Sequence, residues 1–139
     1  MDIEWYGIDR KGNIAVFLSA GEGNIPEFVC ENKDRAVALN AYVEASETIC
    51  GAVLCRELTG GAKGLAEELA GKGLYYFDSD NGLRSGVCNG QRNYTKRAQP
   101  EKPLKYAELP MDIRELLKKN GLDIDDFSNV DRIVVAHAY

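Results

Sequence analysis

This 139-residue chain has little histidine, no paired cysteine motif and no long apolar run. His137 is its one histidine, and its four cysteines form no Cys-x-x-Cys pair, so no zinc-binding pattern is present. No apolar stretch approaches the roughly 20 residues that a membrane-spanning helix needs. We therefore expect no metal centre, no other cofactor and no membrane segment.

The start of the chain also lacks the features of a secretory signal. Met1-Asp2-Ile3-Glu4 is acidic and strand-like, with neither a basic region nor an apolar region in the usual order. Thiols in the cytoplasm are kept reduced. We therefore expect a cytoplasmic protein whose four cysteines are free thiols: Cys30, Cys50, Cys55 and Cys88.

Positive charge is in short supply. The formal net charge is −5, and acidic residues exceed basic ones in residues 1–70 and 111–139, whereas residues 71–110 have a basic excess. An acidic surface repels phosphate backbones, which disfavours nucleic-acid binding. The same surface would attract a basic protein partner by charge complementarity. The composition is that of a globular protein, and the length predicts a single domain over residues 1–139.

The chain is organised around a hairpin near its start. Two β-rich runs, residues 4–9 and 14–19, flank a short polar loop in which Gly12 can adopt the positive φ of a tight turn. Alternation along the first strand places Trp5 and Tyr6 on opposite faces. Both faces carry bulky side chains, so we expect the hairpin to lie centrally and to be covered on at least one side.

Three segments show helical periodicity with an apolar stripe: residues 35–49, 62–70 and 110–119. Strand-like runs accompany them at residues 74–77, 87–98 and 132–139. Residues 52–55 suit either a helical turn or a short buried strand. Residues 93–97 are polar and basic, which is typical of an exposed edge strand.

The strands are arranged as hairpins rather than as alternating β-α-β units. This order is typical of α+β proteins, in which helices cover one side of an antiparallel sheet. The sequence therefore predicts an α+β fold with a mainly antiparallel sheet of five or six strands. About three helices should pack on one side of that sheet.

No group of side chains has the spacing of a catalytic or metal site, so we predict no catalytic residue and no enzymatic activity. The loop from Asp78 to Gly82 is typical of a hairpin turn, because its Gly comes one position too early for a calcium loop. Aromatic and charged residues at strand ends and hairpin tips suit a protein-binding surface. We predict such an interface at Asp9, Tyr75, Tyr76, Asp78, Asp80 and Arg84.

The opening of the chain carries a family resemblance. Residues 5–21 contain an aromatic pair, a short Asp-x-x-Gly hairpin, an aromatic second strand and a glycine-containing loop. With residues 74–78 and the stretch from Pro103-Leu104 through Leu109-Pro110, this opening resembles small bacterial immunity proteins of polymorphic toxin systems. The resemblance implies a cytoplasmic protein without enzymatic activity that binds a toxin domain and blocks its active site. It carries over no catalytic residue.

Two other interpretations stay open. The chain could be a small ligand-binding domain or enzyme with a pocket between sheet and helices. The working groups would then be Cys30, Cys88, His137 or the pair Asp78 and Asp80. Alternatively, the strand between Val87 and Arg97 could form a homodimer through its exposed edge. The sequence specifies neither a partner nor an oligomeric state.

Overall fold

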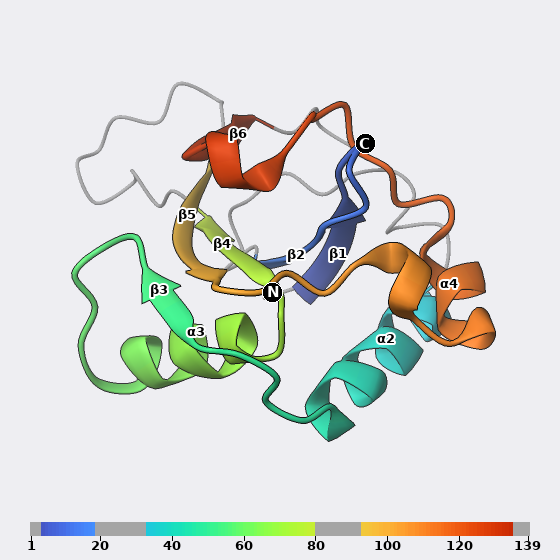
Figure 1. Ribbon diagram of the computed structural model, residues 1–139, viewed down its shortest axis with the longest axis horizontal. Helices are drawn as coiled ribbons and strands as arrows, with labels where there is room; N and C mark the ends of the chain where they lie inside the picture. The colour runs from blue at the N-terminus through green and yellow to red at the C-terminus, as the bar shows by residue number, and fades with distance from the viewer. Residues whose placement is uncertain (1–3, 19–32, 80–92, 135–139) are drawn as a thin grey trace.

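The computed structural model of the protein describes residues 4–18, 33–79 and 93–134. In these ranges, three α-helices pack on one side of a curled mixed sheet, which confirms the predicted α+β fold (Figure 1). The helices are α2 (Lys33–Ala45), α3 (Gly60–Gly71) and α4 (Met111–Leu117). The strands are β1 (Glu4–Ile8), β2 (Ile14–Leu18), β3 (Ala52–Leu54), β4 (Tyr75–Ser79), β5 (Asn93–Pro100) and β6 (Arg132–Val134). Two short 3-10 helices are η2 (Tyr106–Glu108) and η3 (Phe127–Asn129).

The sheet follows the order β1-β2-β4-β5, and the outer edge of β5 is shared by two short strands. β3 pairs with the end of β5, and β6 pairs with its beginning. The pairing of β2 with β4 is parallel because α2, β3 and α3 carry the chain back across the sheet between them. The other strand pairings are antiparallel, so the sheet is mainly, but not purely, antiparallel.

The hairpin at the start of the chain is confirmed. β1 and β2 pair antiparallel from Glu4 opposite Leu18 to Ile8 opposite Ile14, and Gly12 has a φ of 82°. The two faces of β1 also separate as predicted. Trp5 belongs to the core on one side of the sheet, and Tyr6 belongs to the core on the other side.

One of these two cores is rich in aromatic rings, and we call it the aromatic core. Its buried members are Trp5, Ala15, Phe17, Tyr75, Phe77, Tyr94, Phe127 and Ile133. The rings of Trp5 and Phe17 are stacked, with centroids 4.0 Å apart, and Phe77 stacks on Phe17 at 5.0 Å. The aromatic core lies on the side of the sheet that η3 and β6 cover.

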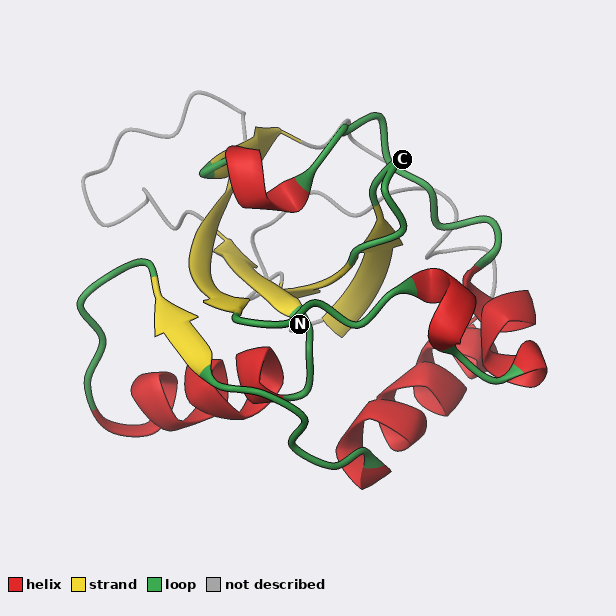
Figure 2. Ribbon diagram, in the orientation of Figure 1, coloured by secondary structure: helices red, strands yellow, loops and turns green. Residues whose placement is uncertain are grey.

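The second core lies under the three helices, and we call it the helix-side core. It combines aliphatic residues of the strands with Leu39 of α2, Leu69 of α3 and Ile113 of α4. Figure 2 shows the helices together on this side of the sheet, away from η3 and β6. The three described α-helices therefore pack on one side of the sheet, as predicted. None of the helices in the described ranges is long and apolar enough to cross a membrane.

Residues 120–134, which we call the C-terminal strap, connect the two outer edges of the sheet. The strap starts beside β1, where the Ile8 amide donates to Asn120 O at 2.9 Å and the Leu122 amide donates to Ile8 O at 2.8 Å. It then passes over the aromatic core and ends as β6 beside β5 (Figure 1). Gly7 makes the start possible, because a Cβ there would lie 2.5 Å from Leu122 Cδ1.

Two sequence predictions need correction. The basic stretch 93–97 is not an exposed edge, because β5 is paired on both sides and Lys96 is buried. The helix predicted over residues 35–49 ends at Ala45. The open alternative at residues 52–55 resolves as strand β3. The predicted turn at Asn81-Gly82 lies outside the described residues.

Candidate functional site

Of the four predicted interface residues that the structure describes, three lie in the interior. Tyr75 and Tyr76 are each 3% exposed and Asp9 is 4% exposed. Asp78 is partly buried, and its carboxylate accepts a hydrogen bond from the Tyr76 hydroxyl at 3.4 Å. Asp80 and Arg84 lie outside the described residues, as do Cys30, Cys88 and His137. Asp9, Tyr75 and Tyr76 are therefore largely withdrawn from solvent, and an interface at the six residues stays a prediction.

Asp9 is instead a structural carboxylate that joins the hairpin to the strap. It accepts hydrogen bonds from the backbone amides of Lys11, Asn13 and Phe127, at 3.0, 2.8 and 2.8 Å. It also accepts from Asn13 Nδ2 at 2.8 Å. A buried charge is tolerated when such donors surround it. The sequence signal for this role was the Asp-x-x-Gly turn, but the donor from Phe127 is 118 residues away.

Burial also raises the pKa of the Tyr75 and Tyr76 phenols. Loss of hydration raises the pKa of the Tyr75 phenol to about 12, with a smaller contribution from the charges of Asp126 and Asp9. The pKa of Tyr76 is raised as well, first by burial and then by the charge of Asp78. Both phenols therefore stay neutral at physiological pH. Their packing between sheet and cover gives them a structural role.

Lys96 is the buried cation of the aromatic side. Its Nζ donates to Phe127 O at 3.0 Å and to Ser128 O at 3.2 Å, and it lies 6.0 Å from the centroid of the Tyr75 ring. Burial lowers the pKa of this ammonium group. Lys96 therefore ties β5 to η3, and its charge is used inside the protein.

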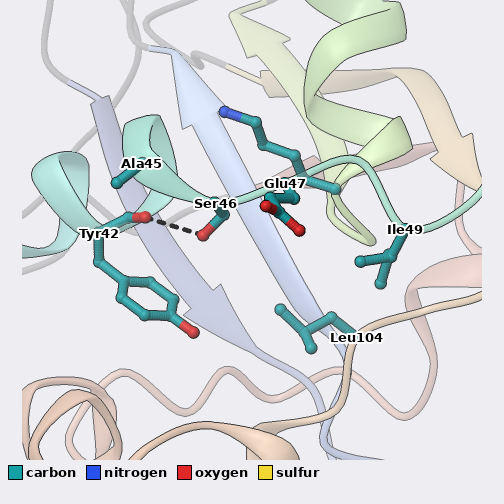
Figure 3. A pocket seen from close by; sticks show the side chains of 7 residues that line it. Tyr42, Ala45, Ser46, Glu47, Ile49 and Leu104 are labelled. Atoms are coloured by element: carbon teal, nitrogen blue, oxygen red, sulfur yellow. Dashed lines mark hydrogen bonds between the residues drawn. The ribbon is translucent and has the colours of Figure 1, made fainter.

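An open cavity of about 340 Å³ lies on the helix side, where α2 ends (Figure 3). Seven residues from three separate stretches of the chain line it: Tyr42, Ala45, Ser46, Glu47, Ile49, Lys72 and Leu104. We call this cavity the α2 pocket. Figure 3 shows the Tyr42 ring on one side, Ile49 and Leu104 opposite it, and the Glu47 carboxylate between them.

The α2 pocket forms because α2 ends at Ala45 and does not continue to Ile49. Ser46 Oγ donates to Tyr42 O at 2.8 Å, and the Ser46 amide donates to Val43 O at 3.1 Å, so the helix ladder is not continued. The Ile49 amide then donates to Gly71 O at 2.7 Å, which draws residues 46–50 across the end of α3. Ser46, Glu47 and Ile49 therefore line one pocket. In a continued helix they would point in different directions around the axis.

Gly73 allows the apolar walls of the pocket to meet. Its φ is 92°, and Leu104 donates to its carbonyl oxygen at 2.9 Å. A Cβ at this position would lie 2.7 Å from Leu104 Cβ and 2.9 Å from Ile49 Cδ1. Glycine therefore permits both the backbone conformation and the close approach of the two side chains.

Lys72 lines the pocket and binds the end of α2. Its ammonium group donates to Val43 O at 2.7 Å and Glu44 O at 3.3 Å, and it pairs with Glu68 at 3.4 Å. Free carbonyl groups and the negative end of the helix dipole accumulate at a helix C-terminus, and α2 has no basic residue in its last turn. Lys72 therefore serves α2 as a cap, and its donors face the protein rather than the opening.

The remaining polar groups of the α2 pocket face no described partner. Glu47 is exposed, and neither its carboxylate nor the Tyr42 hydroxyl forms a hydrogen bond with any residue in the described ranges. Ile49 is a large apolar side chain with 49% of its surface exposed. The pocket thus combines apolar walls with a carboxylate that has no partner among the described residues.

Other chemistry that the sequence left open is not assembled in the described residues. Asp78 does not line the α2 pocket, and Cys50 and Cys55 are free thiols. Within the described ranges, no group of three or more histidine, cysteine or acidic side chains could hold a metal ion. Sequence reasoning missed the pocket residues because they come together only through the early end of α2 and the contact of Gly73 with Leu104.

Comparison with known proteins gives no match, whether the chain is compared with family models, with curated proteins or with solved structures.

Proposed function

We propose that this chain is a non-enzymatic binding protein that holds a partner protein at the α2 pocket. The observation that carries the proposal is the exposed Ile49 beside the unpaired carboxylate of Glu47. An apolar anchor position with a nearby polar group is typical of the energetic centre of a protein interface. Residues 36–55 contain acidic side chains but no lysine or arginine, so this surface favours a basic partner.

The use of the buried charges supports binding rather than catalysis. Asp9, Lys72 and Lys96 each have their hydrogen bonds within the protein. A general acid or base needs a group that reaches the reacting atoms, and these three are held in structural contacts. The resemblance to immunity proteins of toxin systems adds the class of partner, a toxin domain whose active site the protein would block.

A second candidate is binding of a small polar ligand. The α2 pocket holds hydroxyl groups of Tyr42 and Ser46 next to a carboxylate, and its volume is at the lower end of small-molecule sites, which span about 300–1,000 Å³. Such a ligand would occupy the same walls as a partner side chain. The two candidates differ in whether a protein is captured with the chain.

The test is capture of a partner by the tagged full chain, with two surface variants. If a large open reading frame lies next to the gene, its C-terminal region is the natural bait, co-expressed so that rescue of growth can be scored. Ile49→Asn should weaken capture about tenfold or more, because it replaces the apolar anchor with a polar side chain and adds no charge. Val37→Asn is the matched control, since Val37 is 67% exposed on α2 but does not line the pocket. Equal capture by both variants, or a small molecule instead of a protein, would contradict the proposal.

A further inference from the structure

We infer that the α2 pocket receives a cationic side chain, arginine or lysine, from the partner protein. The aliphatic stem would lie between Tyr42, Ile49 and Leu104, and the charged head would meet the Glu47 carboxylate. This inference rests on the proposed function and names the part of the partner that enters the pocket. It follows from the sign of the charge at the opening, the position of Lys72 and the shape of the walls.

The opening of the pocket carries the negative charge of Glu47, which no described residue pairs. The C-terminus of α2 also carries the negative end of the helix dipole, but Lys72 already caps it. Glu47 is therefore the group that would attract a cation. The net charge of −5 adds a weaker long-range attraction for cations.

Lys72 does not reverse this sign for an incoming group. Its ammonium group has three donors, and three acceptors surround it: Val43 O, Glu44 O and Glu68 Oε2. The side chain is 8% exposed, so its charge is enclosed by the end of α2 and by α3. A carboxylate or phosphate entering the pocket would find no spare donor on Lys72. A cation would find a spare acceptor on Glu47.

The walls fit the stem of a long cationic side chain. Lysine and arginine bury their methylene groups along apolar surfaces while the charged end stays at a polar rim. Tyr42, Ile49 and Leu104 supply that apolar surface, and Glu47 stands between them (Figure 3). The Tyr42 ring can also attract a cation through its face. A guanidinium group would further gain two parallel hydrogen bonds to the carboxylate.

The experiment titrates the isotope-labelled full chain with a capped tripeptide amide whose central residue is arginine, followed by nuclear magnetic resonance. The same tripeptide with citrulline is the control, because citrulline keeps the shape of arginine without the charge. We expect the arginine peptide to shift the amide signals of residues 46–50 and Leu104, and to bind about fivefold more tightly than the citrulline peptide. The difference should shrink as salt is added.

Two variants locate the charge that is recognised. Glu47→Gln should remove the preference for arginine over citrulline. Glu57→Gln should keep it, since Glu57 is an exposed carboxylate that does not line the α2 pocket. Equal binding of the two peptides, absence of binding by both, or an unchanged preference in Glu47→Gln would each overturn the inference.

Partner capture by two variants of the chain distinguishes this inference from the proposed function. If Ile49→Asn weakens partner capture and Glu47→Gln weakens it about fivefold, both statements are supported. If Ile49→Asn weakens capture and Glu47→Gln leaves it unchanged, the pocket is an interface but the cationic occupant is wrong. If neither variant affects capture, both statements fail.

Discussion

The two sides of the sheet differ in whether their charged groups have hydrogen-bond partners within the protein. On the aromatic side, the strap covers the rings, and the charges of Asp9 and Lys96 are met by backbone groups of Phe127 and Ser128. On the helix side, the cover opens at the end of α2, where Glu47 has no partner in residues 4–18, 33–79 and 93–134 and Ile49 is half exposed. Both sides of the sheet hold a buried core, and the helix side also carries the surface that we propose for binding.

The same strands supply both sides through their alternation. Adjacent residues such as Trp5 and Tyr6, or Val16 and Phe17, point to opposite cores. A change to one side can therefore be made with little direct effect on the other. This independence makes the comparison testable by substitution.

The largest expected difference is in the loss of apolar contacts. Phe17→Ala should lower the free energy of unfolding by about 3–5 kcal/mol, because Phe17 is fully buried and stacked between Trp5 and Phe77. Ile49→Ala should cost only about 1 kcal/mol, since half of its surface already faces solvent. Urea unfolding of both variants measures the difference. Similar losses in the two variants would show that the α2 pocket is as much a part of the core as Phe17 is.

Loss of the Asp9 carboxylate should likewise destabilise the protein more than loss of the Glu47 carboxylate. Asp9→Ala leaves the amides of Asn13 and Phe127 without an acceptor, and we expect a loss of about 2–4 kcal/mol in unfolding free energy. Glu47→Gln should change stability by less than about 0.5 kcal/mol, because its carboxylate has no described partner to lose. Thermal unfolding of the two variants side by side provides the measurement. A stable Asp9→Ala protein would mean that Asp9 does not join the hairpin to the strap.

Local patterns predicted much of this architecture. The first hairpin, β4, α3 and α4 follow from alternation, helical periodicity and end signals such as Gly12 and Pro110. These signals act over a few residues, so they can be read directly from the chain. The α+β class follows from the order of the elements.

Features that depend on distant partners could not be predicted in this way. β5 is central because β3 and β6 both pair with it, and a polar strand with Lys96 can be buried only when carbonyl groups such as Phe127 O meet its charge. Tyr75 and Tyr76 were expected at a surface, but both sides of β4 are covered. The α2 pocket depends on a hydrogen bond from the Ile49 amide to Gly71 O, which replaces a bond within a longer α2.

Lys72 lines the α2 pocket and also caps the C-terminus of α2. Lys72→Met keeps most of the stem but removes the donors to Val43 O and Glu44 O, so we expect a loss of about 1–2 kcal/mol and faster amide exchange at the end of α2. Lys63→Met on the exposed part of α3 is the control and should have little effect. If Lys72→Met exchanges no faster at that end, Lys72 does not cap the helix.

The smallest effect concerns pH and the strap. Hydrogen bonds from Ser128 lower the pKa of Asp126 from its ordinary value of 3.8 to about 2. A depressed pKa in the folded state gives stability that is present above about pH 4 and is lost as the pH falls toward 2. We expect Asp126→Asn to be less stable than the parent by about 1 kcal/mol near neutral pH. The gap should close between about pH 4 and pH 2 in unfolding measured as a function of pH, and a constant gap would contradict this account.

Hydrogen exchange of the full chain, alone and bound to its captured partner, tests the central claim most directly. Binding should slow exchange in residues 46–50 and at Leu104, around the α2 pocket, and leave the strap and the loop at Gly12 unchanged. Slowed exchange confined to residues 120–134 or to the hairpin loop would show that recognition occurs on the aromatic side. That result would contradict the proposed binding surface on the helix side of the sheet.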